Sequence, residues 1–305
     1  MYQYALCACS DAVMAFDASA VRAALHEQGL AVCRVAPVPG GWGGPNFRAD
    51  TSAGPLIVKV RRDVRPLSVA KTVAGILSLR GVPHPMLVVT PTPVAEGWMI
   101  AHRWIEGTSL DAAGLGDWDD AHASRLGADL GGWLRRLHAV EHRRGGWSRT
   151  AQRRYADKLR RCLELGVIDA ELADAVRRRW VADAAALEAV TPTLIHRDLQ
   201  PGNIVVRSGR LAAVIDFEQS RIADPLYDLV KLSEWIFPLH PAVAPALYEA
   251  YGLDGTHAGV RARLRVVSVL EYLSALVYFA KRKDVAMVDG QRNLLSQVAE
   301  DPAHD

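Results

Sequence analysis

One stretch of the sequence constrains the fold more than any other. Residues 194–203 read L-I-H-R-D-L-Q-P-G-N, and residues 214–217 read V-I-D-F. Between these two stretches the runs 203–207 and 211–215 are rich in β-branched and aliphatic side chains, and Ser208-Gly209-Arg210 separates them as in a tight turn. We therefore predict a β-hairpin that returns the chain to the point where it began. Such a hairpin would bring Asp216 close to Asp198 and Asn203.

These three polar side chains form a set with a recognisable chemistry. The pattern H-R-D-x-x-x-x-N, followed by a strand that ends in Asp-Phe, is typical of phosphoryl transfer. On the loop, Asp198 can accept the proton of an attacking hydroxyl group, while Asn203 and Asp216 supply the hard oxygen ligands that Mg²⁺ prefers. The alternative is a polar turn in which Asp and Asn serve only as turn formers. The spacing of all three residues favours the catalytic interpretation.

A second set of residues lies upstream and suggests phosphate binding. Residues 39–46 read P-G-G-W-G-G-P-N between two strand-like runs, and Lys59 lies within the apolar run 56–60. Glycines allow a backbone to approach phosphate closely, and a strand lysine can bind phosphate oxygens. Taken alone, the loop is more typical of a hairpin turn, and Lys59 could equally be a surface residue. A Walker-type phosphate loop is excluded, because the chain contains no G-x-x-x-x-G-K-[ST] sequence.

The composition excludes several classes of protein. The 305 residues carry 36 basic and 34 acidic side chains, a balance that argues against binding nucleic acid by charge. Residues 1–18 lack the cations of a signal peptide, and the apolar stretch 266–280 is interrupted by Glu271 and is too short to span a bilayer. We expect that stretch to be a buried helix. The four cysteines lack metal-binding spacing, so we expect free thiols in a cytoplasmic protein without a membrane or nucleic-acid partner.

The pattern of the chain predicts an α+β fold in two parts. In residues 1–103 we expect short strands and two helices, 19–27 with Ser19 as N-cap and 66–79. The expected strands are 32–38, 46–50, 56–60, 86–90 and 97–101. Residues 104–305 are mainly helical apart from the hairpin, with an apolar face over 126–137 and an arginine-rich amphipathic region over 155–190.

In these motifs the chain resembles the aminoglycoside phosphotransferase family, which consists of bacterial small-molecule kinases that share the protein-kinase fold. The resemblance covers about residues 38–230 and is carried by residues 40–46, 58–60, 81–83, 105–107, 134–138, 196–203, 214–217 and 224–229. It implies a bilobal fold, with a small N-terminal antiparallel β lobe for the nucleotide in residues 1–103. A larger helical lobe for catalysis and substrate binding would occupy residues 104–305.

The resemblance also implies roles for individual residues. Asp198 would be the catalytic base, and Asn203 and Asp216 would bind Mg²⁺. Arg197 and Asp228 would support the catalytic loop. The nucleotide, ATP or GTP, would be bound by Lys59 at its α- and β-phosphates, by Gly41 and Asn46 in the covering loop, and by a hinge that includes His102, Arg103 and Ile105.

Two positions depart from the family pattern. The helix 66–79 has no acidic residue to pair with Lys59, and Lys71 lies near the expected site. Either Asp63 supplies the partner or the nucleotide alone binds Lys59. Glu218 follows Asp216-Phe217 where protein kinases carry glycine, which favours a small-molecule kinase over a protein kinase.

The acceptor is the least determined part of the prediction. Candidate substrate residues are Glu218, Glu234, Trp235, Glu271 and Tyr272, although the two aromatic residues are more typical of a core and we expect the acids to be solvated. The arginine-rich stretch 153–179, if it faced the cleft, would disfavour a polycation and suit a neutral or anionic acceptor.

We expect a monomer or homodimer that phosphorylates a hydroxyl group of an antibiotic of the aminoglycoside, nucleoside or macrolide type and so confers resistance. The alternatives are a metabolic kinase for a sugar, a choline-like alcohol or an amino alcohol, and a regulatory pseudokinase, which only the missing acidic partner suggests.

Overall fold

The computed structural model describes residues 17–39, 44–141, 146–255 and 257–301. The chain folds as two units. Unit 1 comprises residues 1–78 and 84–105, and unit 2 comprises residues 79–83 and 106–305. Gly41, predicted to cover the nucleotide, lies outside the described residues.

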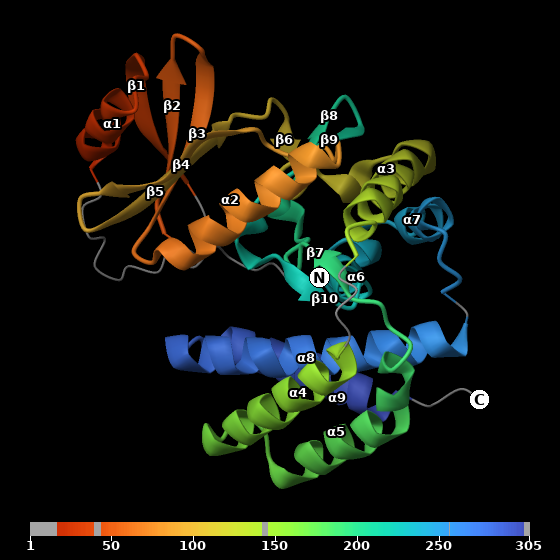
Figure 1. Cartoon of the computed structure of the whole chain (residues 1–305). Coiled ribbons are helices and arrows are strands. Elements are labelled where there is room, and N and C mark those ends of the chain that lie inside the picture. The colour runs from red at the N-terminus through yellow and green to blue at the C-terminus, as the bar shows by residue number, and fades with distance from the viewer. Residues whose placement is uncertain (1–16, 40–43, 142–145, 256, 302–305) are drawn as a thin grey trace. The chain divides into compact units, whose positions relative to one another are not determined.

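Unit 1 is built on a five-stranded antiparallel sheet (Figure 1). The strand order is β1-β2-β3-β5-β4. The strands are β1 (Val32–Val38), β2 (Asn46–Thr51), β3 (Gly54–Arg61), β4 (Leu87–Val94) and β5 (Gly97–Arg103), and the helices are α1 (Ala18–Glu27) and α2 (Val64–Leu79). All five strands lie where the sequence predicts them, with ends that differ by a few residues.

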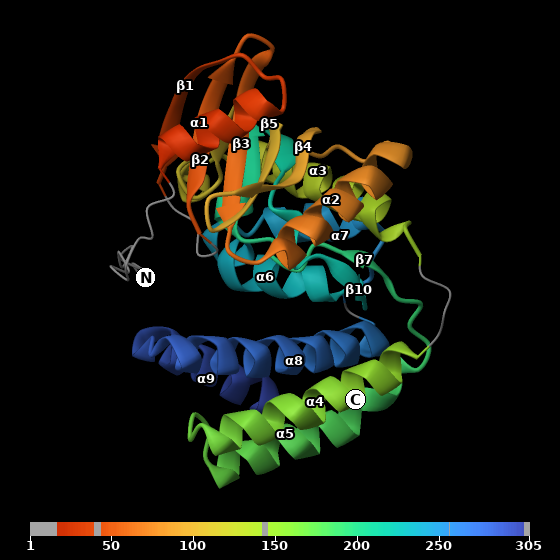
Figure 2. The same cartoon turned by 60° about the vertical axis from the view of Figure 1, so that its left-hand side comes forward.

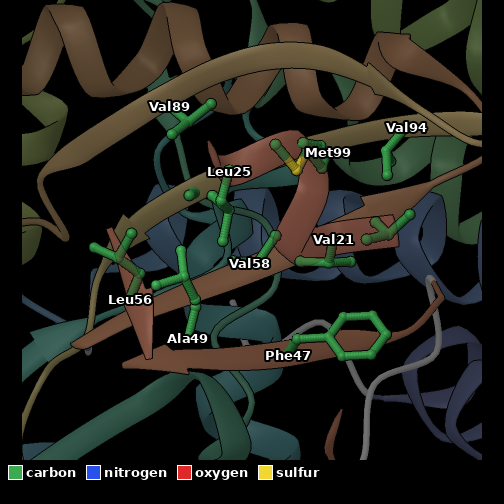
Figure 3. Close-up of a cluster of buried hydrophobic side chains, with 13 residues drawn as sticks. Val21, Leu25, Phe47, Ala49, Leu56, Val58, Val89, Val94 and Met99 are labelled. Carbon is green, nitrogen blue, oxygen red and sulfur yellow. The ribbon is translucent and has the colours of Figure 1, made fainter. Parts of the chain in front are cut away.

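One face of this sheet forms the core of unit 1 with α1. Because side chains alternate along a strand, every second residue of β2 and β3 points to the same face. Phe47 and Ala49 of β2 and Val58 of β3 are buried there against Val21 and Leu25 of α1 (Figure 3). The opposite face therefore carries Asn46, Arg48 and Lys59. On that opposite side, α2 contributes Leu67 and Ala70 to a small cluster with Ile100 of β5.

The start of α1 differs from the prediction. The N-cap is Asp17, whose carboxylate accepts a 3.0 Å hydrogen bond from the backbone N–H of Ser19, and Ser19 lies in the first turn. An aspartate cap leaves a negative charge at the positive end of the helix dipole, which stabilises the helix start. Ser19 as N-cap is therefore wrong by two residues.

Unit 2 is mainly helical, and its longest helix is α8 (Ala258–Arg282). Figures 1 and 2 show α4 and α5 on one side of α8, with α9 beside it. Residues 266–277 of α8 are buried except Ser274, which confirms the predicted buried helix. The other helices are α3 (Asp120–His138), α4 (Trp147–Glu164), α5 (Ala170–Asp183), α6 (Tyr227–Trp235), α7 (Val243–Tyr251) and α9 (Val285–Glu300), with short 3₁₀ turns at Leu115–Asp117, Ala184–Leu187, Pro201–Asn203, Phe217–Gln219 and Phe237–Leu239.

The predicted hairpin is present in unit 2. It consists of β8 (Ile204–Arg207) and β9 (Arg210–Val214), joined by Ser208 and Gly209 at φ 50° and 70°. Two consecutive residues with positive φ are the signature of a type I′ turn, which matches the twist of antiparallel strands. The two-residue strand β6 (Thr108–Ser109) extends this sheet, while β7 (Thr193–Ile195) pairs with β10 (Arg221–Ala223).

Among the described residues, no helix is long and apolar enough to cross a membrane. Cys33 and Cys162 are free thiols, as expected, and burial raises the pKa of Cys162 to about 12. A thiol with this pKa is protonated at neutral pH and therefore unreactive.

The packing of α3 against α7 depends on two glycines of α3. A Cβ atom added at Gly127 would lie 2.3 Å from the carbonyl oxygen of Val243, and one added at Gly131 would lie 2.4 Å from that of Leu247. Both oxygens belong to the backbone of α7, so they cannot move aside as a flexible side chain can. The glycines therefore allow the two helices to approach closely.

We predict that Gly131→Ala destabilises the protein by about 1–3 kcal/mol, because the new methyl group forces α3 and α7 apart. The matched control is Gly132→Ala on the same helix, where an added Cβ meets only the end of the Arg136 side chain at 3.9 Å. That change should stabilise the protein by about 0.5–1 kcal/mol through helix propensity. Urea unfolding of the two variants measures both effects, and equal effects would contradict the packing argument.

Candidate active site

The loop after β7 is held by one buried carboxylate. Asp228, near the start of α6, is 1% exposed. Its Oδ2 atom accepts a 2.8 Å hydrogen bond from the backbone N–H of His196, and its Oδ1 atom accepts one of 2.5 Å from that of Arg197. The ring of His138 on α3 lies 3.0 Å from the same carboxylate. Asp228 thus fixes the two residues that precede Asp198.

His196 connects this loop to the end of the hairpin. Its ring is fully buried between Trp133 and Phe217. The Nδ1 atom accepts a 3.2 Å hydrogen bond from the backbone N–H of Asp198, and the Nε2 atom lies 2.9 Å from the carbonyl oxygen of Ile215. This pair of contacts requires the tautomer with the proton on Nε2. The ring therefore links Asp198 to the residue directly before Asp216.

Asn203 completes the connection between the loop and the hairpin. Its Nδ2 atom donates to the carbonyl oxygen of Asp198 at 2.8 Å and to the Asp198 carboxylate at 3.1 Å. Its own carbonyl oxygen accepts a 2.9 Å bond from the backbone N–H of Ile215. The structure thus joins Asp198, Asn203 and the strand end that carries Asp216, as the hairpin predicted.

Two residues of the site have an unusual backbone conformation. Arg197 and Asp216 both have φ of 71°, in the left-handed region that side chains other than glycine rarely adopt. Each such residue costs about 1–3 kcal/mol and persists only where its surroundings hold it. The two hydrogen bonds of Asp228 supply that support at Arg197. The strained backbone therefore lies at Arg197, directly before the candidate base, and at Asp216, at the end of the hairpin.

Burial raises the pKa of Asp198 above its usual range, and the negative charges of Asp216 and Glu271 act in the same direction. His196 and Lys231 oppose this rise. A less solvated carboxylate with a raised pKa is a better proton acceptor than one in water. The electrostatics of the loop therefore suit a general base.

The residues near Asp198 fit a magnesium ion better than a transition metal. Within the described residues there is no group of three or more His, Cys, Asp or Glu side chains placed to bind a metal. Asn203 uses its amide nitrogen for Asp198, and in the described structure its amide oxygen accepts no hydrogen bond. Magnesium typically takes one or two protein oxygens and completes its shell with phosphate and water. Asn203 and Asp216 have the donor atoms for this role.

In unit 1, the predicted phosphate-binding residues share one face of the sheet. Lys59 of β3 lies opposite Asn46 of β2, which lies opposite Val38 of β1. This is the face that α1 leaves uncovered. A pocket of about 510 Å³ lies on it, lined by Arg34, Ala36, Pro37, Val38, Pro39, Arg48, Asp50 and Trp104. The Arg48 guanidinium stacks on the Trp104 ring at 4.9 Å.

The predicted hinge begins inside a strand. His102 and Arg103 are the last residues of β5, where the backbone N–H of Arg103 donates to Met86. The backbone N–H of Trp104 donates to Pro55. These two N–H donors bond within the sheet, so Ile105 is the one predicted hinge residue that follows the strand. The sequence analysis predicts that this strand ends at residue 101, whereas its pairing with β3 and β4 continues to the hinge residues His102 and Arg103.

The carboxylate of Asp63 accepts hydrogen bonds from the backbone and side chain of Arg65 at the start of α2. Its contacts thus hold the beginning of the helix. Lys71 is exposed on the same helix.

The two candidate acids on α6 and α8, Glu234 and Glu271, have buried side chains with bonding partners. Glu271 is 7% exposed, with the Arg197 guanidinium 3.2 Å and the Lys231 ammonium 3.8 Å from its carboxylate. Glu234 accepts a 3.1 Å bond from the Trp235 indole and also bonds to Tyr272, which is buried. The expectation that these two acids are solvated is wrong, because neighbouring cations and N–H or O–H donors stabilise them below the surface. Tyr272 lies in the core, as its alternative interpretation required, while Trp235 and Glu218 are half-buried.

Several residues near Asp198 were missed by the sequence analysis. Lys231 on α6 and Tyr278 on α8 both interact electrostatically with Asp198. Arg154 on α4 and Arg221 on β10 interact in the same way with Arg197. Their positions in long helices or in a three-residue strand give no local motif. The scarcity of lysine was a signal for Lys231, one of only six lysines in the chain.

Comparison with known families agrees with this geometry. The model of the phosphotransferase enzyme family matches residues 34–265, about three quarters of the chain. The chain belongs to this family. No curated protein sequence matches it significantly.

Solved structures confirm the kinase-like fold. The aminoglycoside phosphotransferase APH(2″)-Ib bound to ADP is 17% identical, with a TM-score of 0.70 over 93% of this chain and 98% of that one. A mutant of APH(4)-Ia in a ternary complex with ADP and hygromycin B is 14% identical, with a TM-score of 0.73 over 91% and 97%. The APH(2″) complex with GDP and kanamycin is 17% identical, with a TM-score of 0.70 over 91% and 97%. The α+β fold with a β-rich N-terminal part and a helical remainder is therefore confirmed.

We predict that Asp228→Asn destabilises the protein by about 3–5 kcal/mol, because an NH₂ group replaces one of the two buried carboxylate oxygens and then faces a backbone N–H group without an acceptor between them. A control is Asp129→Asn, since Asp129 pairs with Arg210 near the surface. The control substitution should lower the free energy of unfolding by less than about 1 kcal/mol. Chemical unfolding measures both changes, and similar losses in the two variants would contradict the anchoring role of Asp228.

Proposed function

We propose that this phosphotransferase moves the γ-phosphoryl group of ATP or GTP to a hydroxyl group of a small molecule in a Mg²⁺-dependent reaction. The observation that carries the proposal is the connected arrangement of Asp198, Asn203 and the strand end at Asp216. A turn that merely capped a hairpin would not require a buried anchor, a buried imidazole link and two strained residues. Family membership supports the same reaction class.

In this proposal, the residues in and around the loop have separate roles. Asp198 orients the acceptor hydroxyl and accepts its proton, while Arg197 and Asp228 hold the loop. Magnesium, bound by Asn203 and Asp216, would neutralise charge on the phosphates of the nucleotide. We assign nucleotide binding to residues 1–103, with Lys59 and Asn46 on the phosphates. Residues 104–305 then carry catalysis and the acceptor, in a cytoplasmic enzyme where nucleoside triphosphates and magnesium are present.

For the acceptor, an antibiotic hydroxyl group remains the first candidate. Similar folds occur in complexes with hygromycin B and kanamycin, although sequence identity to them is low. One observation favours the sugar among the metabolic alternatives over a polycationic aminoglycoside, a choline-like alcohol or an amino alcohol, because the last three are cations. Arg154, Arg197, Arg221 and Lys231 interact electrostatically around the acceptor-side residues, and this positive charge repels polycations. The connected catalytic set argues against the pseudokinase alternative.

We predict that Asp198→Asn lowers kcat by about 10²–10⁴-fold, because asparagine cannot accept the hydroxyl proton. Nucleotide binding should change little, since Asp198 does not bind the nucleotide in this scheme. Nucleotide consumption with Mg²⁺ across aminoglycosides, nucleoside antibiotics, macrolides and metabolic alcohols identifies a usable acceptor and gives kcat. Calorimetric titration with a non-hydrolysable ATP analogue gives the affinity.

The control variant is Asp289→Asn, an exposed aspartate of α9 that pairs with Arg292. It should retain both activity and binding. Undiminished turnover by Asp198→Asn would contradict the proposed base, and loss of both properties in that variant would indicate a folding defect rather than a catalytic one.

A further inference from the structure

We propose that the acceptor carries an anionic group, a carboxylate or a phosphate, and that Arg154 and Arg221 bind it. The inference rests on the proposed function, because it names the substrate class of the same site. It depends on a cluster of three guanidinium groups, those of Arg154, Arg197 and Arg221, that come together from three elements of unit 2.

The three arginines converge although they are far apart in the sequence. Arg221 of β10 lies opposite Ile195 of β7, so the two-stranded sheet places it beside the loop that contains Arg197. Arg154 lies on α4, which packs against α8. Burial and the charge of Arg197 lower the pKa of Arg154, and burial together with the charges of Arg197 and Arg154 lowers the pKa of Arg221 to about 10. All three groups are therefore close enough to repel one another, and all are protonated at neutral pH.

The carboxylates that interact with this cluster, Glu271 and Asp198, offset only part of its charge. Glu271 is bonded to Arg197 at 3.2 Å and lies 3.8 Å from Lys231. Neither Arg154 nor Arg221 forms an ion pair with any residue that the structure describes. Instead, the Arg221 guanidinium stacks on the Tyr227 ring at 5.3 Å, and that of Arg154 on the Trp147 ring at 5.8 Å. Stacking uses only the face of a guanidinium group, so the N–H groups at its edge can still donate to an acceptor.

Unsatisfied donors point to the same conclusion. Within the described residues, four buried guanidinium nitrogens have no hydrogen-bond acceptor, and three of them belong to this cluster: Nη1 of Arg154, Nε of Arg197 and Nε of Arg221. The fourth is Nε of Arg179. Buried polar groups in proteins are nearly always hydrogen-bonded, and each exception carries a free-energy cost. Arg154 and Arg221 are each partly exposed although these nitrogens are buried, so an anion from solvent can approach both residues and would reach the nitrogens through a shift of the two side chains. An oxyanion would satisfy the free donors and reduce the repulsion among the three charges.

Because the arginine cluster lies beside Asp198, we assign the bound anionic group to the acceptor molecule. Arg197 directly precedes Asp198, the residue proposed to orient the acceptor hydroxyl. The other cations near this loop extend the same positive region. Lys158 lies one turn after Arg154 on α4, and its pKa is lowered by burial and by the charges of Arg161, Arg197 and Lys281. A hydroxylated acid or a sugar phosphate fits this arrangement, with its hydroxyl group at Asp198 and its anion at the arginines.

The test compares acceptors that differ only in charge. Calorimetric titration uses the full chain with Mg²⁺ and a non-hydrolysable ATP analogue. The matched probes are D-glycerate against glycerol and ribose 5-phosphate against ribose, with inorganic phosphate as a simple anion. The carboxylate and phosphate pairs distinguish the two sources of charge. The variants are Arg154→Gln and Arg221→Gln, and the control is Arg153→Gln, an exposed neighbour on α4.

We expect at least one anionic probe to bind about tenfold or more tightly than its neutral counterpart to the wild type and to Arg153→Gln. Arg154→Gln and Arg221→Gln should lose this preference. Without a probe, Arg221→Gln should also raise the thermal midpoint, because it removes a repelling charge. A residue with a purely structural role would lower that midpoint instead, and this result would count against the inference.

Equal binding of charged and neutral probes would overturn the inference, as would an anion preference that survives in both variants. It is also overturned if neither the anionic probes nor inorganic phosphate binds. Turnover separates this inference from the proposed function. Phosphorylation of neutral or polycationic acceptors with no preference for anions refutes the anion site alone. Anion binding with no phosphorylation of any acceptor refutes the proposed function instead.

Discussion

The arrangement of the active site depends on the hydrogen bonds that the Asp228 carboxylate accepts. A buried carboxylate costs several kcal/mol unless donors surround it, and here the backbone N–H groups of His196 and Arg197 and the ring of His138 do so. The same bonds hold Arg197 in its left-handed conformation, which turns the chain so that Asp198 follows. Helices α3 and α6 thus determine where the candidate base lies.

The parts of this site that sequence could predict are those with a local signature. The type I′ turn at Ser208-Gly209 requires residues that tolerate positive φ, so the hairpin and the proximity of Asn203 and Asp216 could be predicted. The strands β7 and β10 could not, because three residues are too few to show alternation. Their pairing is what brings Arg221 beside the catalytic loop.

Local sequence patterns also could not predict which charged side chains are buried. Glu234 and Glu271 resemble solvated acids in sequence, since the cations that stabilise Glu271 come from the loop and from α6. The pKa of Glu271 is lowered although burial opposes this, because Arg197, Lys231 and Arg221 are all close. The chain therefore surrounds its catalytic loop mainly with arginine, whose planar fork suits oxyanions. The fold is that of a phosphotransferase, and the proposed acceptor side carries a positive charge.

The most direct measurement of the central claim follows the phosphoryl group itself. Phosphorus NMR of the purified protein with ATP or GTP, Mg²⁺ and the acceptor panel distinguishes a phosphomonoester from inorganic phosphate. The account predicts a new phosphomonoester signal on one class of acceptor, formed in step with nucleoside diphosphate and absent with Asp198→Asn. Nucleotide converted only to diphosphate and inorganic phosphate with every acceptor, or an ester that still forms in that variant, would contradict it.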